Sequence, residues 1–264
     1  MPVSTLPRTL GLCALVPLFA LPAQPADAQI ATDRPDFVES SATVGAGAMQ
    51  LETSVSYGRT GSGAGRLATW STPTLIRLGV GDVFEFRLES DAWVWDASTA
   101  SQGDDGFADI AVGFKWHLGD ERGSTPSTAI LVHADLPSGS EALRGDGVRP
   151  SLRAVAEWTL PSGLALGVMP GIALERESGS AFLAGIVGVV LGLELTASLR
   201  SFAEVSFEQL AAADRGGNVG TFNAGLALLL TENLQLDTGV AWGLTESAQD
   251  VSWGLGLSVL APGG

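Results

Sequence analysis

The sequence predicts an all-β fold, a transmembrane antiparallel β-barrel of about twelve strands with short periplasmic turns and longer extracellular loops. Three observations carry this prediction. Apolar and polar residues alternate along one segment after another, each segment has the length of a tilted strand that crosses a bilayer, and the connections alternate between short and long. Because successive side chains of an extended chain point to opposite faces, such a segment has one apolar and one polar face.

The predicted strands follow one another along the chain. They cover residues 48–58, 67–79, 83–95, 106–118, 126–137, 149–160, 163–174, 181–192, 198–209, 219–230, 234–243 and 251–260. Short connections, the second somewhat longer than the rest, are predicted at 79–82, 119–125, 161–163, 194–197 and 231–233. Longer stretches rich in Gly, Ser, Asp and Glu separate the other strands, and one of them is ERESGS at 175–180. An even number of strands puts both ends of the barrel on the periplasmic side.

The segment GFADIAVGFKWHL at 106–118 shows the alternation clearly. One parity carries Ile110 and Val112, and the other carries Asp109 and Lys115. An outer-membrane barrel would turn the first set to lipid and the second to a wet lumen, whereas a soluble sandwich would turn the charges to bulk water. The alternation by itself fits both arrangements.

The tryptophans fall near the ends of the predicted strands rather than at mid-strand. Trp116 and Trp158 lie near short-turn ends, and the long-loop ends carry Trp70, Trp93, Trp95, Trp242 and Trp253. Indole favours the headgroup layer, so this distribution predicts aromatic girdles at both membrane interfaces. Strict alternation would turn Trp93 and Trp95 inward, which predicts either a bulge in their strand or a mouth narrowed by the two rings.

Residues 180–199 offer an alternative, because they are apolar enough to suggest a transmembrane helix. Their β-branched residues and a predicted turn at 194–197 favour two strands instead. A helix here would exclude the barrel.

The first 28 residues have the features of an export signal. Arg8 supplies a positive charge, residues 9–21 form an apolar stretch too short to span a bilayer comfortably, and Ala-Asp-Ala at 26–28 has the form of a cleavage site. We therefore expect a cleaved signal peptide over 1–28, an N-terminal periplasmic or plug segment over 29–47, and an outer-membrane barrel over 48–264.

Composition and charge exclude several classes of function. The formal net charge of −15 argues against binding of nucleic acid, whose phosphates need a basic surface. The only cysteine, Cys13, lies in the predicted signal, so the mature chain has no thiol for a disulfide, a metal or catalysis. No serine motif or metal-ligand spacing accompanies the only histidines, His117 and His133. We expect no enzymatic activity, no metal and no cofactor, and the oligomeric state stays open.

Three motifs give a family resemblance. The mature chain opens with TDRPDF at 32–37, a Gly-x-x-Asp turn at 79–82 precedes alternating Leu, Glu and Arg residues, and Gly106 and Asp109 lead into the fourth strand. In these features the chain resembles the outer-membrane transporter family named for the meta-pathway of phenol degradation. The resemblance implies a barrel that passes small, hydrophobic or aromatic molecules across the outer membrane of a Gram-negative bacterium. One departure is the end of the chain, SVLAPGG, which lacks the terminal aromatic residue usual in such barrels.

The candidate functional residues are charged or titratable side chains predicted to face the lumen. A solute path is predicted along Glu52, Arg77, Glu85, Arg87, Glu89, Asp91, Asp109, Lys115, His117, Arg153, Glu157, Arg200, Glu204 and Asp237. The alternative is a mutually neutralising network that holds a narrow barrel shut.

Asp33, Arg34 and Asp36 lie before the first strand and form a second group of candidates. They either fold into the lumen as a small plug, paired with inward charges such as Arg77, Glu85 and Arg87, or order the periplasmic mouth of the barrel. A twelve-strand barrel lies between filled eight-strand barrels and open sixteen-strand porins, so a partly occluded lumen is expected.

The sequence therefore favours an outer-membrane channel or transporter for small, hydrophobic or aromatic molecules, with membrane lipid as the partner of its outer face. A closed barrel with a structural or adhesive role is the first alternative, and it would fold normally but pass no solute. A soluble periplasmic all-β binding protein is the second, and it would be recovered without detergent.

Overall fold

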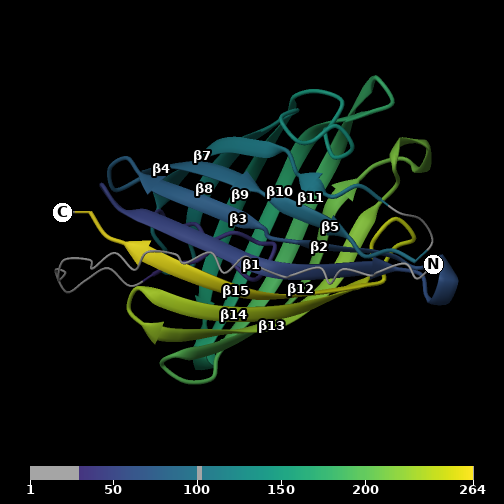
Figure 1. The fold of residues 1–264 in the computed structure, drawn as a ribbon. Helices are drawn as coiled ribbons and strands as arrows, with labels where there is room; N and C mark the ends of the chain where they lie inside the picture. The colour runs from purple at the N-terminus through teal and green to yellow at the C-terminus, as the bar shows by residue number, and fades with distance from the viewer. Residues whose placement is uncertain (1–29, 100–102, 264) are drawn as a thin grey trace, which may run out of the picture.

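The computed structural model describes residues 30–99 and 103–263, so the predicted signal peptide lies outside the described residues. The described strands form one antiparallel sheet that closes on itself (Figure 1). They are β1 Met49–Thr60, β2 Leu67–Ser71, β3 Thr74–Gly79, β4 Phe84–Ser90, β5 Trp93–Asp96, β6 Gly106–Phe107, β7 Ile110–Gly119, β8 Ser127–Leu136, β9 Arg149–Leu160, β10 Leu164–Glu177, β11 Ser180–Glu194, β12 Leu199–Leu210, β13 Val219–Thr231, β14 Leu234–Gly243 and β15 Val251–Ala261.

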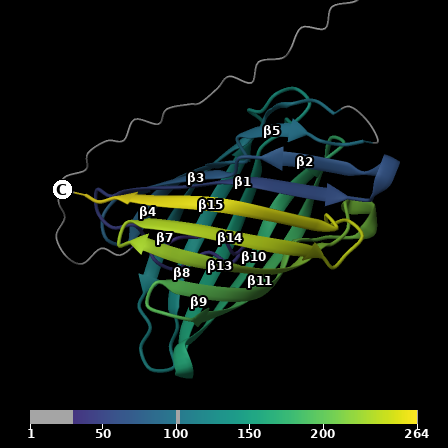
Figure 2. The same cartoon turned by 60° about the horizontal axis from the view of Figure 1, so that its bottom comes forward.

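Closure is made by the first and last strands. β15 pairs with β1 over the whole stretch from Met49 opposite Ala261 to Arg59 opposite Val251. Figure 2 shows β15 lying between β1 and β14. Apart from the two-residue β6, which pairs only with β5, every strand has a neighbour on each side, so the backbone donors and acceptors of the wall are paired.

The 15-stranded sheet makes a 12-strand barrel, because three of its crossings are each divided into two strands. These are β2 with β3, β4 with β5, and β6 with β7. The predicted twelve-strand antiparallel barrel is therefore confirmed, and β9 and β14 have the bounds that the sequence predicts. Between β2 and β3 the register against β1 is unchanged, and the interruption falls at Pro73, which has no N–H for the ladder.

The interruption between β4 and β5 changes the direction of the side chains. β5 pairs with β2 in a register shifted by one residue from that of β4 with β3. The extra residue lies at Ala92, whose φ of 49° is in the left-handed region. The shift turns Trp93 and Trp95 outward, and Trp93 packs edge-on against the exposed Phe107 with ring centroids 4.7 Å apart. The inward orientation given by strict alternation is wrong, and the bulge explains why.

The predicted polar loop at 175–180 is also wrong. β10 and β11 continue through it as a hairpin, and Glu177 pairs with Ser180. Only Ser178 and Gly179 form the turn, with φ of 50° and 77°. Positive φ at both central residues is the turn geometry that matches the twist of paired strands.

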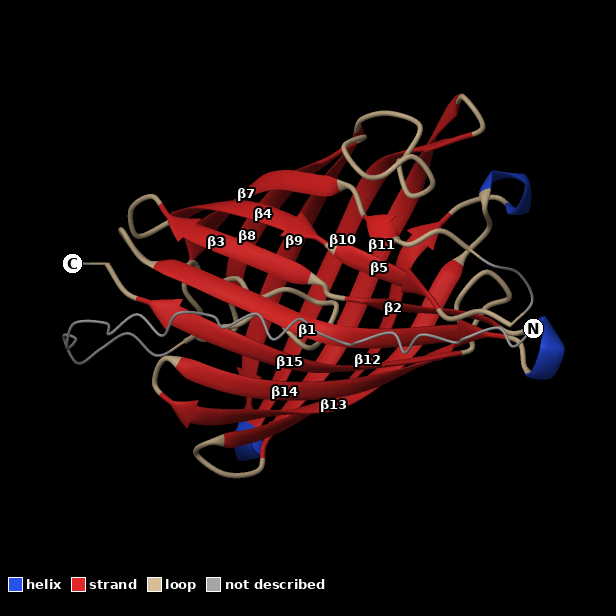
Figure 3. Cartoon of the chain, viewed as in Figure 1, coloured by secondary structure: helices blue, strands red, loops and turns tan. Residues whose placement is uncertain are grey.

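The apolar stretch at 180–199 forms β11 and the beginning of β12, as its β-branched residues predict. In the described part of the chain, helical structure is confined to three short 3-10 turns, η1 Gly63–Gly65, η2 Pro161–Gly163 and η3 Ala213–Arg215 (Figure 3). Within residues 30–99 and 103–263, no helix has the length and apolar character needed to cross a membrane.

The outer face of the barrel is an apolar belt between two aromatic rims. Large apolar side chains at alternate positions point out of the wall, among them Phe86 at 59% exposure and Leu255 at 58%. At the long-loop rim the Trp70 ring lies 4.9 Å from Tyr57 and 5.4 Å from Trp253, between ring centroids. At the short-turn rim Phe84 stacks on Trp116 at 5.5 Å. This arrangement is typical of a wall in contact with lipid.

Candidate functional site in the charged barrel interior

Residues Ile30–Ala48, here called the N-terminal segment, lie inside the barrel and contain neither helix nor strand. The segment begins at the short-turn end, where the Ile30 N–H donates to the Glu232 carbonyl at 2.8 Å. Asp33 and Glu39 are buried against the inner wall. A buried segment without regular structure must find other partners for its backbone N–H groups.

Carboxylates of the wall supply those partners. Four glutamates on β1, β4, β9 and β12 accept hydrogen bonds of 2.6 to 3.2 Å from the segment's backbone: Glu52 from Asp33, Glu85 from Val44, Glu157 from Ser41, and Glu204 from Phe37 and Val38. Hydrogen bonds to ionised acceptors are about twice as strong as neutral ones. The inward glutamates therefore hold the segment from several sides of the barrel.

The Asp33 carboxylate is the centre of a buried ion network. Lys115 Nζ lies 2.9 and 2.8 Å from its two oxygens, Arg87 Nη1 lies 2.5 Å from Oδ2, and Arg77 Nη1 lies 3.5 Å from Oδ2. Arg77 also donates to both oxygens of Glu85, at 2.8 and 2.9 Å. Burial raises the pKa of Asp33, but the charges of Arg77, Lys115 and Arg87 outweigh it and hold the pKa well below its usual range.

Other wall residues contact the segment around this network. Arg153 Nη1 lies 2.8 Å from Glu39 Oε1, and His117 Nδ1 lies 3.0 Å from the Ser41 carbonyl oxygen. Arg34 has two partners in the wall: its carbonyl oxygen lies 3.1 Å from Arg200 Nη2, and its Nη2 lies 3.4 Å from Asp237 Oδ1. Arg87 Nη2 reaches the second oxygen of Glu39 at 2.6 Å. Burial raises the pKa of Glu39, and the Arg87 and Arg153 charges reverse that effect, so the net shift is downward.

One side of the segment packs against an apolar cluster. Val38 contacts a group of buried residues from β8 to β11, namely Leu131, Val155, Met169 and Val190. The Arg153 guanidinium lies 5.9 Å from the centre of the Phe37 ring. The segment is thus held to the inner wall by ion pairs on one side of the barrel and by apolar contacts on another.

The structure separates the predicted lumen residues into two groups. Most of them contact the N-terminal segment, whereas Glu89, Asp91 and Asp109 do not. Asp109 accepts hydrogen bonds from the backbone of Ser138, Gly139 and Gly145 at 3.0, 2.9 and 2.9 Å, so it ties down the loop between β8 and β9. Glu89 lies 4.0 Å from His133 Nε2 and projects into open space.

The three predicted segment residues behave differently from one another. Asp33 pairs with Arg77 and Arg87, which are partners named in the plug alternative. Arg34 pairs with Asp237. Asp36 has no ion pair within 4.0 Å in the described part of the chain.

Sequence reasoning missed several residues that hold the segment. Glu39 carries two of its ion pairs, yet it lies outside the TDRPDF motif. Gln50 and Gln235 donate to the Ala31 carbonyl and to Thr32 Oγ1, both at 2.9 Å. Both glutamines occupy the inward parity of their strands, so a search for uncharged polar residues at inward positions would have found them.

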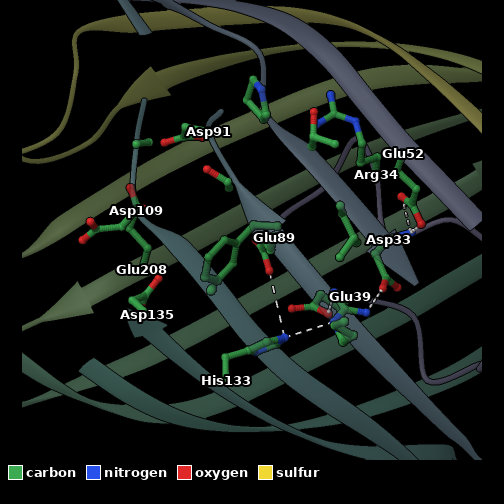
Figure 4. Close-up of a pocket in the computed structure, with 18 of the residues that line it drawn as sticks. Asp33, Arg34, Glu39, Glu52, Glu89, Asp91, Asp109, His133, Asp135 and Glu208 are labelled. Carbon is green, nitrogen blue, oxygen red and sulfur yellow. Dashed lines mark hydrogen bonds and ion pairs between the residues drawn. The ribbon is translucent and has the colours of Figure 1, made fainter. Parts of the chain in front are cut away.

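Cavities remain around the segment. The outer cavity, of about 480 Å³, lies toward the long loops, and its lining includes Glu89, Asp91, Asp135 and Glu208 (Figure 4). A side cavity of about 370 Å³ adjoins it and shares Arg34, Pro73 and Asp91 with it. The inner cavity, of about 220 Å³, lies toward the short turns and is lined by the N-terminal segment, by Glu157 of β9, by residues of β11 to β14 and by the turn at 195–198. The lumen is therefore occluded but not filled.

Solved outer-membrane barrels share this fold. An outer-membrane channel from Pseudomonas putida F1 aligns with a TM-score of 0.61 and 13% identity, over 90% of this chain and 100% of that chain. The NanC porin aligns with a TM-score of 0.53 and 10% identity, over 80% and 98%. The beta domain of the Bordetella autotransporter BrkA aligns with a TM-score of 0.52 and 12% identity, over 81% and 99%. None of the curated proteins compared with the chain matches it.

The family match covers both the N-terminal segment and the barrel. The sequence pattern of the family described as "Putative MetA-pathway of phenol degradation" matches residues 32–261, from the start of the TDRPDF motif to the last residue of β15. The resemblance carried by the sequence motifs is thereby confirmed, and the chain belongs to this family.

Proposed function

We propose that the protein is a channel through which small, hydrophobic or aromatic molecules cross the outer membrane of a Gram-negative bacterium. The observation that carries the proposal is a closed barrel, apolar outside, whose lumen keeps cavities on both sides of the N-terminal segment. A barrel with a purely structural role has no need of open space on either side of such a segment. Membership of a family named for phenol degradation supports aromatic molecules as the solutes.

The same proposal assigns the parts of the chain. Residues 1–28 direct export and are cleaved, residues 29–47 form the plug, and residues 48–264 form the barrel with lipid around it. The channel passes its solute without making or breaking a bond, so it needs neither catalytic groups nor a cofactor. The inward charges hold the plug and line the solute path.

The plug is the element that must yield for a solute of aromatic size. Between the outer and inner cavities the lumen is occupied by residues of the N-terminal segment. Its contacts are polar and individually reversible, apart from the apolar cluster around Val38. Displacement of part of the segment would open a passage wide enough for an aromatic ring between the cavities without unfolding the wall.

A disulfide that locks the segment tests this role. Ser41 Oγ in the segment lies 2.7 Å from Ser127 Oγ at the start of β8. Cysteines at both positions would be the only thiols of the mature chain, because Cys13 belongs to the predicted signal. We expect the S41C/S127C variant to lower uptake of radiolabelled toluene by intact cells under oxidising conditions, and a reductant to restore it.

The matched control is S206C/T221C, whose hydroxyl oxygens lie 3.0 Å apart on β12 and β13. This bond joins two wall strands without holding the segment, so uptake should stay at the wild-type rate. Uptake by the oxidised S41C/S127C variant at the wild-type rate would contradict the plug role. A protein that is heat-modifiable on gels but never raises uptake would instead be a closed structural barrel.

A further inference from the structure

The outer and inner cavities meet at a single residue. Asp36 lines both of them, and no other residue of the described chain lines both. The rest of the outer cavity is formed largely by residues near β3, β4, β7 and β8, and the inner one by residues of β11 to β14. A direct route from one cavity to the other therefore passes the Asp36 side chain.

On two other sides the segment packs against the wall without a gap. On the β3, β4 and β7 side, the ion network of Asp33 leaves its side chains at most 3% exposed. On the β8 to β11 side, Val38 packs into the buried apolar cluster. A small hydrated solute therefore finds its way past Asp36 rather than past Asp33 or Val38.

Asp36 also differs electrostatically from the carboxylates beside it. Asp33 and Glu39 are each paired with two or more cations within 4.0 Å, whereas Asp36 has no such partner among the described residues. Arg200 acts on it from a distance, but this guanidinium donates its hydrogen bonds to Thr32 and to the Arg34 carbonyl. Asp36 is also partly accessible to water, although it lies deep in the barrel. Its charge is therefore available to a passing ion.

We propose that the Asp36 carboxylate forms the constriction of a continuous path through the barrel and makes that path prefer cations over anions. A fixed charge in a narrow, low-dielectric passage attracts ions of the opposite sign and repels those of its own sign. The carboxylates of the outer cavity act in the same direction. They outnumber the arginines of its lining, which are Arg34, Arg87, Arg149 and Arg153, and so raise the local concentration of cations before the constriction. The preference between small ions concerns the resting path. Among aromatic solutes of equal size, which pass only after the segment has moved, the same charge favours benzylammonium over benzoate, and this comparison rests on the proposed channel function.

The first test is the reversal potential of the purified protein in planar bilayers under a KCl gradient. Wild-type protein should prefer K⁺ over Cl⁻, and Asp36→Asn should lower the permeability ratio about thirtyfold. One unit charge at about 4 Å in water changes the partitioning of each ion about fivefold, and it does so in opposite directions for K⁺ and Cl⁻. Asp36→Arg should invert the preference. Glu246→Gln, in the exposed loop between β14 and β15, removes a carboxylate remote from both cavities and should leave the ratio unchanged. An Asp36→Asn variant with the wild-type ratio overturns the inference.

A second test locates the constriction. Asp36→Cys should be modified by a cationic methanethiosulfonate added to either chamber, with a matching change in current, because the residue borders both cavities. Ser90→Cys borders only the outer cavity and should react faster from the long-loop side, and Ser40→Cys borders only the inner cavity and should react faster from the short-turn side. Modification of Asp36→Cys from one side alone contradicts the proposal.

The outcomes separate this inference from the proposed function. A heat-modifiable wild-type protein that carries no current overturns the continuous path, while toluene uptake by cells still tests the aromatic channel. Conversely, an Asp36-dependent ion selectivity without toluene uptake supports the inference and contradicts the aromatic channel.

Discussion

Lys115 Nζ on β7 lies 2.8 Å from Asp33 Oδ2 in the N-terminal segment, and the two side chains are 0% and 3% exposed. A buried charge that loses its partner costs about 3–5 kcal/mol, whereas a pair removed together costs far less. The contact links the segment to the wall but is not part of the barrel's own hydrogen-bond ladder. Its loss should therefore act on the docking of the segment more than on the folding of the barrel.

Asp33→Asn should release the segment. The change leaves Lys115 and Arg87 without their shared carboxylate, so the segment should become sensitive to protease and the ion current should rise several-fold. The barrel should keep its heat-modifiable gel mobility. In the double variant Asp33→Asn/Lys115→Met, the increase in protease sensitivity of the segment should be smaller than the sum of the increases in the two single variants. Asp104→Asn, in an exposed loop, is the control, and equal protease sensitivity in control and variant would argue against the network.

The contact between Asp33 and Lys115 should be lost only at strongly acidic pH. Because the pKa of Asp33 lies well below its usual range in the folded protein, its contribution to docking is complete above the ordinary aspartate pKa of about 4. The contribution is lost only as the pH falls through the lower folded value. Protease resistance of the segment should therefore persist at pH 5, and release at that pH would contradict the assignment.

The ion selectivity should depend on pH near neutrality. Burial raises the pKa of Asp36 to about 7, with Arg200 opposing the rise and Glu204 and Asp33 adding to it. The carboxyl is then charged at pH 8.5 and neutral at pH 5.5. We expect the K⁺ preference of the wild type to fall between these values and that of Asp36→Asn to change much less. Parallel pH profiles in the two proteins would place the titrating group elsewhere.

A charge on the outer face should destabilise the barrel. Val112 lies in the middle of the lipid-facing side of β7 and is 41% exposed. Arginine at a bilayer midplane costs about 2–4 kcal/mol, so Val112→Arg should lower the free energy of unfolding in lipid vesicles by that amount. Val112→Leu keeps the site apolar and should change it by less than about 1.5 kcal/mol. Normal stability of Val112→Arg would contradict the orientation of this strand.

Asp109 should control the loop between β8 and β9. Replacing it by alanine removes three hydrogen bonds to that loop, and one such bond to a charged group contributes about 1.5–3 kcal/mol. We expect trypsin to cleave after Arg144 at least about tenfold faster in Asp109→Ala, with the barrel intact. Asp146→Ala, which leaves these three bonds in place, should be cleaved at a rate much closer to wild type.

The barrel could be predicted from the sequence because strand parity is a local property. Val112 and Lys115 are three residues apart in one strand, so they must lie on opposite faces of it. The alternation of short and long connections then indicates on which side of the membrane each strand ends. The exceptions are also local but lack a distinctive signal. At Ala92 one inserted residue reverses the parity of Trp93 and Trp95, and nothing in the composition of that strand marks the insertion.

The interior could be predicted only in part. That the inward positions carry charge follows from parity, but the partner of each charge does not. Glu204 accepts the N–H groups of Phe37 and Val38 across 167 and 166 residues of chain, a relationship that only closure of the barrel creates. Glu39 escaped notice because it resembles any other polar residue of an irregular segment.

The seam between β1 and β15 has a consequence for biogenesis. The N-terminal segment is the first described part of the chain to be synthesised, yet its partners include Glu232, Gln235 and Asp237, which belong to the last quarter. The segment cannot complete its contacts until those strands are in place. In a chain arrested before the seam closes, the N-terminal segment is therefore not fully docked. Cleavage of the segment by periplasmic proteases would then distinguish unfinished molecules from finished ones.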